Sequence, residues 1–396
     1  LGQFIDHDIT FDPASSLLRA NDPEALHNFR TPRFDLDSLY GEGPDDEPFM
    51  YEQGETVGKL RIRRFGEPEE LDLPRNEEGR AVIGDPRNDE NVVVSQLQLL
   101  FLRVHNKLVD QTGDFEEARR ILRWHYQWIV INDFLRRLVG DQVIDSKLRP
   151  ETVVLGGGEE PSLRSTDLRF YRFADQPYMP VEFSVAAYRF GHSMVRPRYD
   201  VNSQITERPI FDPAGAPGGG QDLRGFQPLL EGWSIHWPSF FKIGEEPVQV
   251  SRLIDTKLAP GLASLPFAPD HPNLAQRNLE RGNTLGLPSG QAVAKRIGAA
   301  PLSEEELAIE GFDGVESVRR DTPLWFYVLR EAALRGEGKR LGPCGSQIVA
   351  ETLIGLLDAD PFSFLNLEPR WEPTPDGPIP KQGERFEVAD MVRFVA

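Results

Sequence analysis

The sequence predicts a mainly α-helical protein: one large helical domain with long loops and few, short strands. Three observations predict this class. Several long segments carry apolar residues at helical spacing, and segments with strand-like alternation are few and short. Glycine (35 residues) and proline (33 residues) are both frequent, which predicts long ordered connections. No repeat and no linker of disordered composition is visible, so residues 1–396 are expected to form a single domain.

The expected helices follow one another along the chain, and most have a recognisable end. Residues 1–10 fit a short helix, and residues 91–111 form an apolar helix that ends in basic and polar residues. Residues 114–140 form a long amphipathic helix closed by Gly140. Further helices are expected at residues 181–195, 289–298 and 346–360, whereas residues 213–225 read as a loop without the Lys-Ser/Thr ending of a phosphate-binding loop.

Composition excludes several classes of function. With 44 basic and 63 acidic residues the formal net charge is −19, which argues against nucleic acid or an anionic membrane as the main partner. The single cysteine, Cys344, excludes an intrachain disulfide and a multi-cysteine metal site. Residues 92–102 are too few and too polar to span a bilayer. No N-x-S/T sequon occurs, which favours a bacterial source, and the start at Leu1 is interpreted as that of an N-terminally truncated fragment.

The opening stretch, LGQFIDHDIT, places a histidine between two aspartates. On a helix, Gln3, Asp6 and His7 share one face, whereas Asp8 is turned about 100° away from His7. The stretch therefore fits an acid–base apparatus or a metal site, with a capped, solvated helix turn as the alternative.

A second motif, TPRFDLDSLYG, alternates oxygen-bearing side chains at Thr31, Asp35 and Asp37. Such oxygens suit a hard cation such as calcium, although the spacing is not that of an EF-hand. The alternative is a simple turn before a Tyr-Gly corner.

Two further motifs precede or occupy apolar helices. In GDPRNDEN, Arg87 and Glu90 lie three residues apart at a helix start, where Asp89 and Glu90 are otherwise ordinary caps. In YRFGHSM, His192 follows Gly191, whose missing side chain leaves room for a flat cofactor, and Arg189 shares the face of His192. A satisfied core histidine is the alternative. Residues 276–291 read as a polar helix followed by a turn.

The order of these motifs resembles that of the animal-type haem peroxidases of the peroxidase–cyclooxygenase superfamily. The matching residues run from Leu1 to beyond Ser289: G-Q-x-x-D-H-D, T-x-x-x-D-x-D-S-x-Y-G, G-D-x-R-x-x-E, R-F-G-H, and N-x-x-R-G with G-L-P. The resemblance implies haem b, a structural calcium ion, and oxidation of small organic, halide or pseudohalide donors by hydrogen peroxide. A role in the response to oxidative stress, and a secreted or periplasmic location, are further expectations.

The resemblance also assigns roles. His7 is expected to be the distal acid–base, Arg87 the distal arginine that stabilises negative charge as the O–O bond breaks, and Gln3 their polar neighbour. His192 is expected to bind the haem iron, with Asn278 hydrogen-bonded to its other ring nitrogen. The remaining expectations are haem ester links through Asp6 and Glu90, a haem propionate at Arg189, and calcium bound by Asp8, Thr31, Asp35, Asp37 and the Arg33 carbonyl.

The chain departs from the mammalian pattern at several positions. Asn91 stands where the myeloperoxidase type has a methionine joined to haem, so that link and strong chloride oxidation are not expected. Asp37 stands in place of a serine, and RGNTLGLP replaces R-x-R-D-H-G-L-P.

Two other functions compete with the peroxidase reading. Fatty-acid dioxygenases of the same fold use a tyrosine three residues before the proximal histidine, where this chain has Arg189, with Tyr188 one residue earlier. A non-catalytic adhesion protein of the same fold is the other, and the presence of His7, Arg87 and His192 argues against it.

Overall fold

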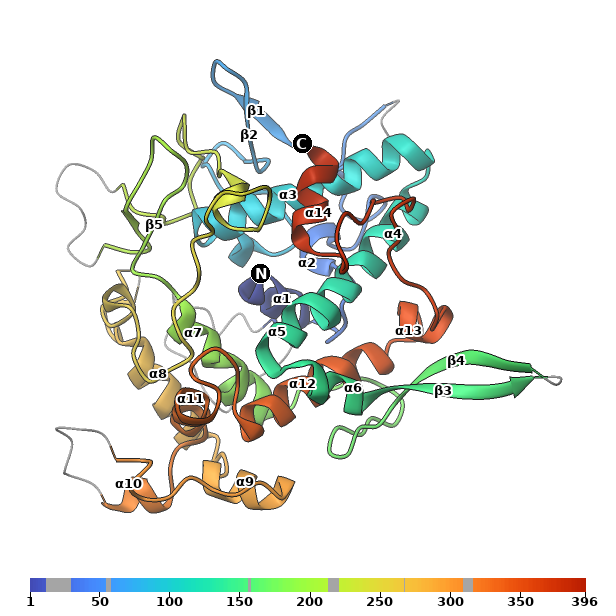
Figure 1. The fold of residues 1–396 in the computed structure, drawn as a ribbon. Helices are drawn as coiled ribbons and strands as arrows, with labels where there is room; N and C mark the ends of the chain where they lie inside the picture. Colours follow the sequence, from blue (N-terminus) through green and yellow to red (C-terminus); the bar gives the residue numbers. More distant parts are fainter. Residues whose placement is uncertain (12–29, 55–57, 156–157, 213–220, 267, 309–315) are drawn as a thin grey trace.

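A computed structural model describes residues 1–11, 30–54, 58–155, 158–212, 221–266, 268–308 and 316–396, with the backbone alone for residues 149–165, 316 and 317. The expected mainly α-helical fold is confirmed. The strands among these residues form three separate antiparallel pairs. Helix α1 (Gly2–Ile9) lies near the centre of the molecule (Figure 1). No helix in the described ranges is long and apolar enough to cross a membrane.

The first half of the chain supplies the longest helices. Its elements are α2 (Asp37–Tyr40), η3 (Pro48–Met50), β1 (Arg63–Phe65), β2 (Glu70–Asp72), η4 (Pro86–Asp89), α3 (Val92–Thr112), α4 (Phe115–Trp128), η5 (Ile129–Leu135), α5 (Arg136–Val139), α6 (Asp141–Lys147), β3 (Leu148–Leu155) and β4 (Gly158–Thr166).

The second half is richer in short elements. These are η6 (Glu182–Ala186), η7 (Ala187–Phe190), α7 (Gly191–Met194), β5 (Arg198–Tyr199), β6 (Arg208–Pro209), η8 (Trp237–Ser239), η9 (Pro260–Leu262), α8 (Leu274–Thr284), α9 (Gly290–Ile297), α10 (Glu316–Arg320), α11 (Leu324–Arg335), α12 (Pro343–Asp358), α13 (Phe364–Leu367) and α14 (Val388–Val395). The expected helices at 289–298 and 346–360 are thus present as α9 and α12.

Helix α3 begins and ends with clear capping signals. The Asn91 side chain accepts a hydrogen bond from the Val94 amide (3.1 Å), and Gly113 ends the helix in the left-handed region at φ 71°. The C-terminal helix α14 returns onto α3, where Arg103 donates to the Val395 carbonyl (2.6 Å). The N-cap of α3 is therefore Asn91, and not Asp89 or Glu90, whose side chains make other contacts.

The expected helix at 114–140 is continuous but not uniformly α. Residues Ile129–Leu135 adopt a π-helix between α4 and α5, and Gly140 ends the helix as predicted. A π-segment has a wider turn than an α-helix, a difference that apolar periodicity does not reveal.

The expected helix at 181–195 is interrupted. A π-turn over Glu182–Ala186 gives way to a 3₁₀ turn and then to α7, and Ala186 leaves the helical region at φ −127°, ψ −71°. These changes of pitch allow the Phe183 and Tyr188 rings to stack 4.6 Å apart, five residues from each other in sequence. Burial of both rings outweighs helix regularity here.

An aromatic cluster packs beneath α1. Phe4 is fully buried and stacks on Phe101 of α3 at 4.6 Å, while the edge of Tyr126 from α4 meets both rings. Phe34 meets Tyr126 from another side. These contacts determine which face of α1 is left for polar groups.

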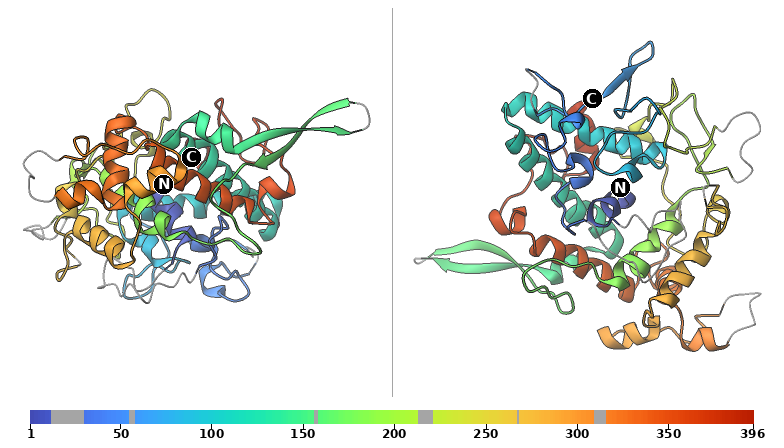
Figure 2. Two further views of the ribbon diagram at one scale, coloured as in Figure 1. Left: turned by 90° about the horizontal axis from the view of Figure 1, so that it is seen from below. Right: turned by 180° about the vertical axis from the view of Figure 1, so that it is seen from behind.

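A long hairpin was not anticipated from the sequence. Strands β3 and β4 pair in antiparallel register from Leu148↔Thr166 to Leu155↔Gly158, with an irregularity between Pro150 and Thr152. The hairpin projects well beyond the body of the molecule (Figure 2). Prolines at 150 and 161 obscured the alternation that would have predicted it.

Candidate active site

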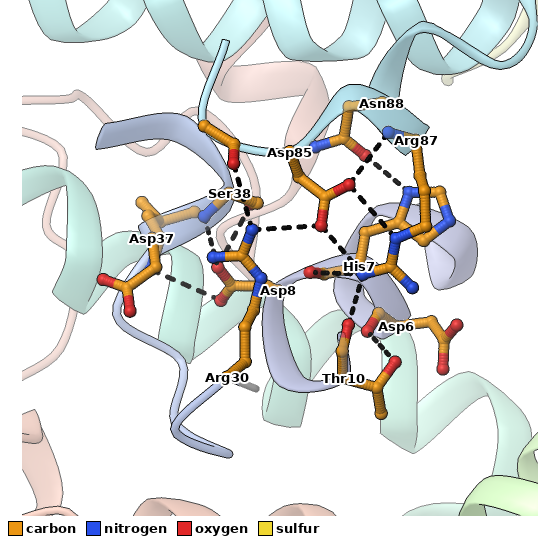
Figure 3. A network of polar contacts seen from close by, with 12 residues as sticks. Asp6, His7, Asp8, Thr10, Arg30, Asp37, Ser38, Asp85, Arg87 and Asn88 are labelled. Carbon is orange, nitrogen blue, oxygen red and sulfur yellow. Dashed lines mark hydrogen bonds and ion pairs between the residues drawn. The ribbon is translucent and has the colours of Figure 1, made fainter. Parts of the chain in front are cut away.

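Helix α1 and the short helix η4 bring the expected distal residues together. His7 faces η4, where its ring meets Asn88, and the 3₁₀ turn of η4 directs its side chains back towards α1 (Figure 3). Asp85 begins η4 by accepting a hydrogen bond from the Arg87 amide (2.8 Å), with Pro86 in its first turn. Two motifs about 80 residues apart in sequence therefore meet at one place.

His7 is buried and contacts Asn88 through its ring. The His7 Nδ1 and Asn88 Oδ1 atoms lie 2.7 Å apart, and Figure 3 draws no contact at the other ring nitrogen, Nε2. Burial, followed by the nearby charge of Arg87, lowers the pKa of His7 to about 4. The imidazole is therefore neutral at pH 7 and suited to accept a proton.

Arg87 is held by the buried carboxylate of Asp85. Its Nε donates to one Asp85 oxygen (3.1 Å) and its Nη2 to the other (2.8 Å). The same Nη2 donates to the His7 carbonyl (3.1 Å) and to the Thr10 carbonyl at the end of α1. These contacts place the guanidinium beside His7, and Figure 3 draws none at Nη1.

Gln3 and Glu90 meet on the same side of α1. The Gln3 amide donates to Glu90 (2.8 Å) and accepts from the Asn91 side chain (3.2 Å). Burial raises the pKa of Glu90 to about 7, against the lowering effect of Arg87. The Asp6 carboxylate, by contrast, has no drawn contact in Figure 3. The structure thus places both expected ester-forming carboxylates near Arg87.

Asp8 lies behind α1, as its turn on the helix predicted. It is fully buried and accepts from the Ser38 hydroxyl (3.1 Å) and the Leu36 amide (3.3 Å). Burial, followed by the negative charge of Asp37, raises the pKa of Asp8 to about 7. Burial and the neighbouring Asp8 and Asp37 likewise raise the pKa of Asp35 well above its usual range.

This acidic cluster has the donor chemistry of a hard-cation site but not a closed geometry. A bound cation would relieve the repulsion between crowded carboxylates, which raises their pKa values. Thr31, however, is exposed, and the described residues contain no group of three acidic, histidine or cysteine side chains arranged to hold a metal. Arg33 places its guanidinium on Gln176 (3.2 Å). The expected calcium ligands are therefore only partly gathered.

The proximal candidates meet between α7 and α8. Asn278 is buried, and its Nδ2 lies 2.9 Å from His192 Nδ1, while its Oδ1 accepts from Arg189 at 3.4 Å. In this arrangement the amide donates to Nδ1. Binding of iron through Nε2 requires the proton on Nδ1 instead, and so requires the Asn278 amide turned over.

Open space adjoins His192, as a bound cofactor requires. A Cβ atom built on Gly191 would meet no atom within 4 Å. Burial and the positive charge of Arg189 lower the pKa of His192 to about 3, so its ring is neutral and able to bind a metal. The proximal residues therefore fit a flat haem bound at His192.

Sequence reasoning missed three polar residues that support the site. Asn88 contacts His7, Gln98 contacts Asn88, and Asp85 pairs with Arg87. Asp85 entered the sequence analysis only as the aspartate of the motif G-D-x-R-x-x-E, with no role of its own. A signal for Gln98 was present, because it is a polar residue in the middle of the apolar pattern of residues 92–104.

Comparisons with known proteins identify the family of this chain. The model of the animal haem peroxidase family matches residues 14–304, a region that contains Arg87, His192 and Asn278. Chorion peroxidase of Drosophila melanogaster is 26% identical over 310 residues, which cover 74% of this chain and 36% of that protein. Thyroid peroxidase of Rattus norvegicus is 22% identical over 390 residues, covering 88% of this chain and 40% of that protein.

Two solved structures share the fold. Peroxidase A from Dictyostelium discoideum superposes with a TM-score of 0.58 at 19% identity, covering 87% of this chain and 67% of that one. A fatty acid alpha-dioxygenase from Oryza sativa superposes with a TM-score of 0.54 at 18% identity, covering 87% of this chain and 61% of that one. The chain spans less than half the length of the two curated relatives named above.

Proposed function

This chain belongs to the animal haem peroxidase family, and on that basis we propose that it reduces hydrogen peroxide and oxidises small organic or halide and pseudohalide donors. The observation that carries this proposal is the meeting of His7 and Arg87 at η4, with Arg87 donating to the His7 carbonyl (3.1 Å). An acid–base group and a fixed positive charge side by side are what cleavage of a peroxide O–O bond requires.

The residues of this chain divide the work. Neutral His7 takes a proton from one peroxide oxygen and returns it to the other, which then leaves as water. Arg87, oriented by Asp85, stabilises the negative charge that develops on the departing oxygen. Haem b, when bound at His192, supplies the electrons and the redox chemistry.

The proximal residues are proposed to hold the cofactor. His192 would bind the iron through Nε2, with the Asn278 amide turned so that its oxygen accepts from Nδ1. Arg189, which donates to Asn278 (3.4 Å) and to the Ser184 carbonyl (2.9 Å), is proposed to exchange its contact with Asn278 for a haem propionate. Its cationic guanidinium suits that anionic partner.

Ester links through Asp6 and Glu90 are a finer proposal. Both carboxylates act electrostatically on the nearby Arg87, and the Glu90 carboxylate accepts a hydrogen bond only from Gln3 (2.8 Å) among the described residues. After peroxide treatment, acid–acetone extraction is expected to leave haem on the polypeptide. The double variant Asp6→Asn, Glu90→Gln should release it, and free haem from the unmodified protein would contradict the links.

Calcium is proposed at the acidic cluster of Asp8, Asp35 and Asp37, with Thr31 and the Arg33 carbonyl as the remaining ligands. The support is the crowding of these carboxylates: burial and then the charge of neighbouring aspartates raise the pKa values of Asp8 and Asp35, and burial raises that of Asp37. A divalent cation removes that repulsion.

A fatty-acid dioxygenase is the second candidate, because the Oryza sativa enzyme shares the fold. Tyr188 is the nearest tyrosine in sequence to His192, but its hydroxyl donates to the Gly2 carbonyl (3.2 Å) and its ring stacks on Phe183. Oxygen uptake with a long-chain fatty acid and no peroxide would favour this candidate; its absence is expected.

The test of the main proposal is peroxide-dependent oxidation of a phenolic donor by haem-loaded protein. His7→Gln is expected to lower the rate by roughly 10²–10⁴, the usual contribution of general acid–base catalysis. His125→Gln is the matched control, because His125 is equally buried. Within the described residues, the only hydrogen bond of its ring is to the Ile121 carbonyl (2.7 Å). Equal rates in the two variants would overturn the proposal.

A further inference from the structure

We propose that Asn88 and Gln98 set the tautomer of His7, so that its Nδ1 carries the proton and its Nε2 presents a lone pair. The inference rests on the proposed function, because it matters only if His7 acts as a base on peroxide. Asn88 and Gln98 are positioning residues in this account, since they act through His7.

The Ser38 carbonyl is a group that can only accept hydrogen bonds. It accepts from the backbone amide of Asp85 (3.1 Å) and from Gln98 Nε2 (3.2 Å). The nitrogen of the Gln98 amide must therefore face Ser38, and its oxygen must face the other way.

The orientation of the Gln98 amide fixes that of the Asn88 amide, which in turn fixes the proton on His7. The Gln98 oxygen accepts from Asn88 Nδ2 at 2.8 Å, so the Asn88 oxygen points to His7, 2.7 Å from Nδ1. An amide oxygen accepts only, so the Nδ1–H of His7 must be the donor. In a neutral imidazole with its proton on Nδ1, Nε2 is unprotonated.

Burial makes this direction hard to reverse. Asn88 and Gln98 are both fully buried, and His7 is 4% exposed, so water cannot replace a lost partner. Turning Asn88 over would set its oxygen against the oxygen of Gln98, and turning both would leave Ser38 facing an oxygen. Each reversal leaves two buried acceptors in contact, an arrangement that folded proteins avoid.

In this tautomer, Nε2 of His7 can accept a proton before peroxide binds. In Figure 3, Nε2 of His7 lies on the side of the ring away from Asn88 and has no contact with the other residues drawn. The opposite tautomer would present an N–H there, which cannot take a proton. A histidine free to choose its tautomer would spend part of its time in that unreactive form.

The first experiment reads the tautomer directly. Protein labelled with ¹⁵N-histidine and loaded with zinc protoporphyrin, a diamagnetic stand-in for haem, is examined by two-bond ¹H–¹⁵N correlation. His7→Gln identifies the His7 signals among those of the 7 histidines. The proposal predicts a protonated Nδ1 and an unprotonated Nε2 for His7; a protonated Nε2 would overturn it.

The second experiment tests Asn88 and Gln98 as the cause. In Asn88→Leu, which offers no acceptor, the His7 spectrum should shift towards protonated Nε2. The second-order rate of the ferric haem protein with peroxide should fall roughly 10- to 100-fold, a loss typical for the outer-shell partner of a functional histidine. Asn88→Asp keeps an acceptor for Nδ1 and should retain protonated Nδ1 and most of the rate, although its second oxygen faces the Gln98 oxygen and should lower the melting temperature.

A matched control separates positioning from loss of stability. Gln98→Met should produce a weaker version of the Asn88→Leu effect on tautomer and rate. Gln127 is also fully buried, and it donates to the Phe34 carbonyl (3.1 Å) and accepts from the Phe364 amide (3.1 Å). Gln127→Met should lower the melting temperature without changing the His7 spectrum or the rate.

The outcomes distinguish this inference from the proposed function. If His7→Gln reacts with peroxide as fast as the unmodified protein, the proposed function fails. If His7→Gln is slow while Asn88→Leu keeps both protonated Nδ1 and the original rate, only the present inference fails. If Asn88→Leu does not fold, the His7 spectrum of the unmodified protein and of Gln98→Met still decides.

Discussion

At the scale of single residues, Asp85 has the most consequential position that the sequence did not reveal. Its carboxylate is fully buried, accepts twice from the Arg87 guanidinium, and also pairs with Arg30 (3.0 Å). Arg87 and the other neighbouring charges outweigh burial and lower the pKa of Asp85. The carboxylate therefore remains charged and determines where the guanidinium of Arg87 lies.

Asp85→Asn is expected to slow the reaction with peroxide by roughly 10- to 100-fold, because an outer-shell partner of a functional side chain is lost. Stopped-flow absorbance of the haem protein measures this rate. Asp72→Asn is the matched control: Asp72 is equally buried and pairs with Arg75 (2.8 Å), and none of its hydrogen bonds among the described residues reaches His7 or Arg87. Both variants should lose stability, but only Asp85→Asn should lose rate; equal rates would exclude this role.

At the scale of elements, α7 and α9 use glycine for opposite purposes. A Cβ atom on Gly290, at the start of α9, would lie 1.9 Å from the Tyr327 ring, so close packing requires glycine there. A Cβ atom on Gly191 would meet no atom within 4 Å. The first glycine serves packing, and the second leaves space beside His192.

Gly191→Leu is therefore expected to fold normally and bind haem poorly. Without haem its stability should stay within about 0.5 kcal/mol of the unmodified protein, as for substitutions that meet no neighbour. Gly290→Ala should instead lose about 1–3 kcal/mol through overpacking. Thermal unfolding and haem titration measure the two effects, and normal haem affinity in Gly191→Leu would refute the account of this space.

Helices α3 and α4 each bury a histidine, which makes the fold sensitive to acid. Burial lowers the pKa of His105 and of His125 to about 4, below the unfolded value of about 6.5. Between these values the unfolded chain binds more protons, so the free energy of unfolding falls as pH falls from about 6.5 to about 4. Each histidine should cost on the order of 2–3 kcal/mol at the acid end.

His125→Leu should reduce this acid sensitivity. Urea unfolding at pH 7 and pH 4.5 gives the difference in unfolding free energy between the two conditions, and that difference should shrink in the variant. The exposed His271 provides the control, as His271→Gln should leave the difference unchanged. A variant as acid-sensitive as the unmodified protein would show that His125 does not titrate in this range.

The sequence predicted elements best where one face of a helix is buried. Residues 91–111 and 346–360 carried clear apolar periodicity and proved to be α3 and α12. The helix at 181–195 was wrong in detail, because ring stacking of Phe183 on Tyr188 imposed changes of pitch that periodicity does not encode. Asn88 escaped notice because its partner, His7, lies 81 residues away in sequence.

At the scale of the whole molecule, a formal net charge of −19 includes the carboxylates behind α1, of which Asp8 is fully buried and Asp35 and Asp37 are half-buried. Asp8, Asp35 and Asp37 raise one another's free energy by repulsion, and Arg30 offsets it only in part. The proposed calcium ion would therefore stabilise the fold as a whole, by linking the segment of Asp35 and Asp37 to helix α1.

Removal of calcium by a chelator is expected to lower the melting temperature, and added calcium should restore it. At a calcium concentration of 100 times Kd the stabilisation would be about 2.7 kcal/mol. Asp35→Asn should reduce the response, whereas the exposed Asp376→Asn should not. A melting temperature that ignores both chelator and calcium would contradict the proposed site.

The measurement that tests the central claim most directly is the optical spectrum of haem-loaded protein before and after one equivalent of hydrogen peroxide, compared with His192→Ala and His7→Gln. The account predicts a ferric haem spectrum that changes within milliseconds to seconds in the unmodified protein, weak haem binding in His192→Ala, and a slow change in His7→Gln. A protein that binds no haem, or a ferric spectrum that peroxide leaves unchanged, would contradict it.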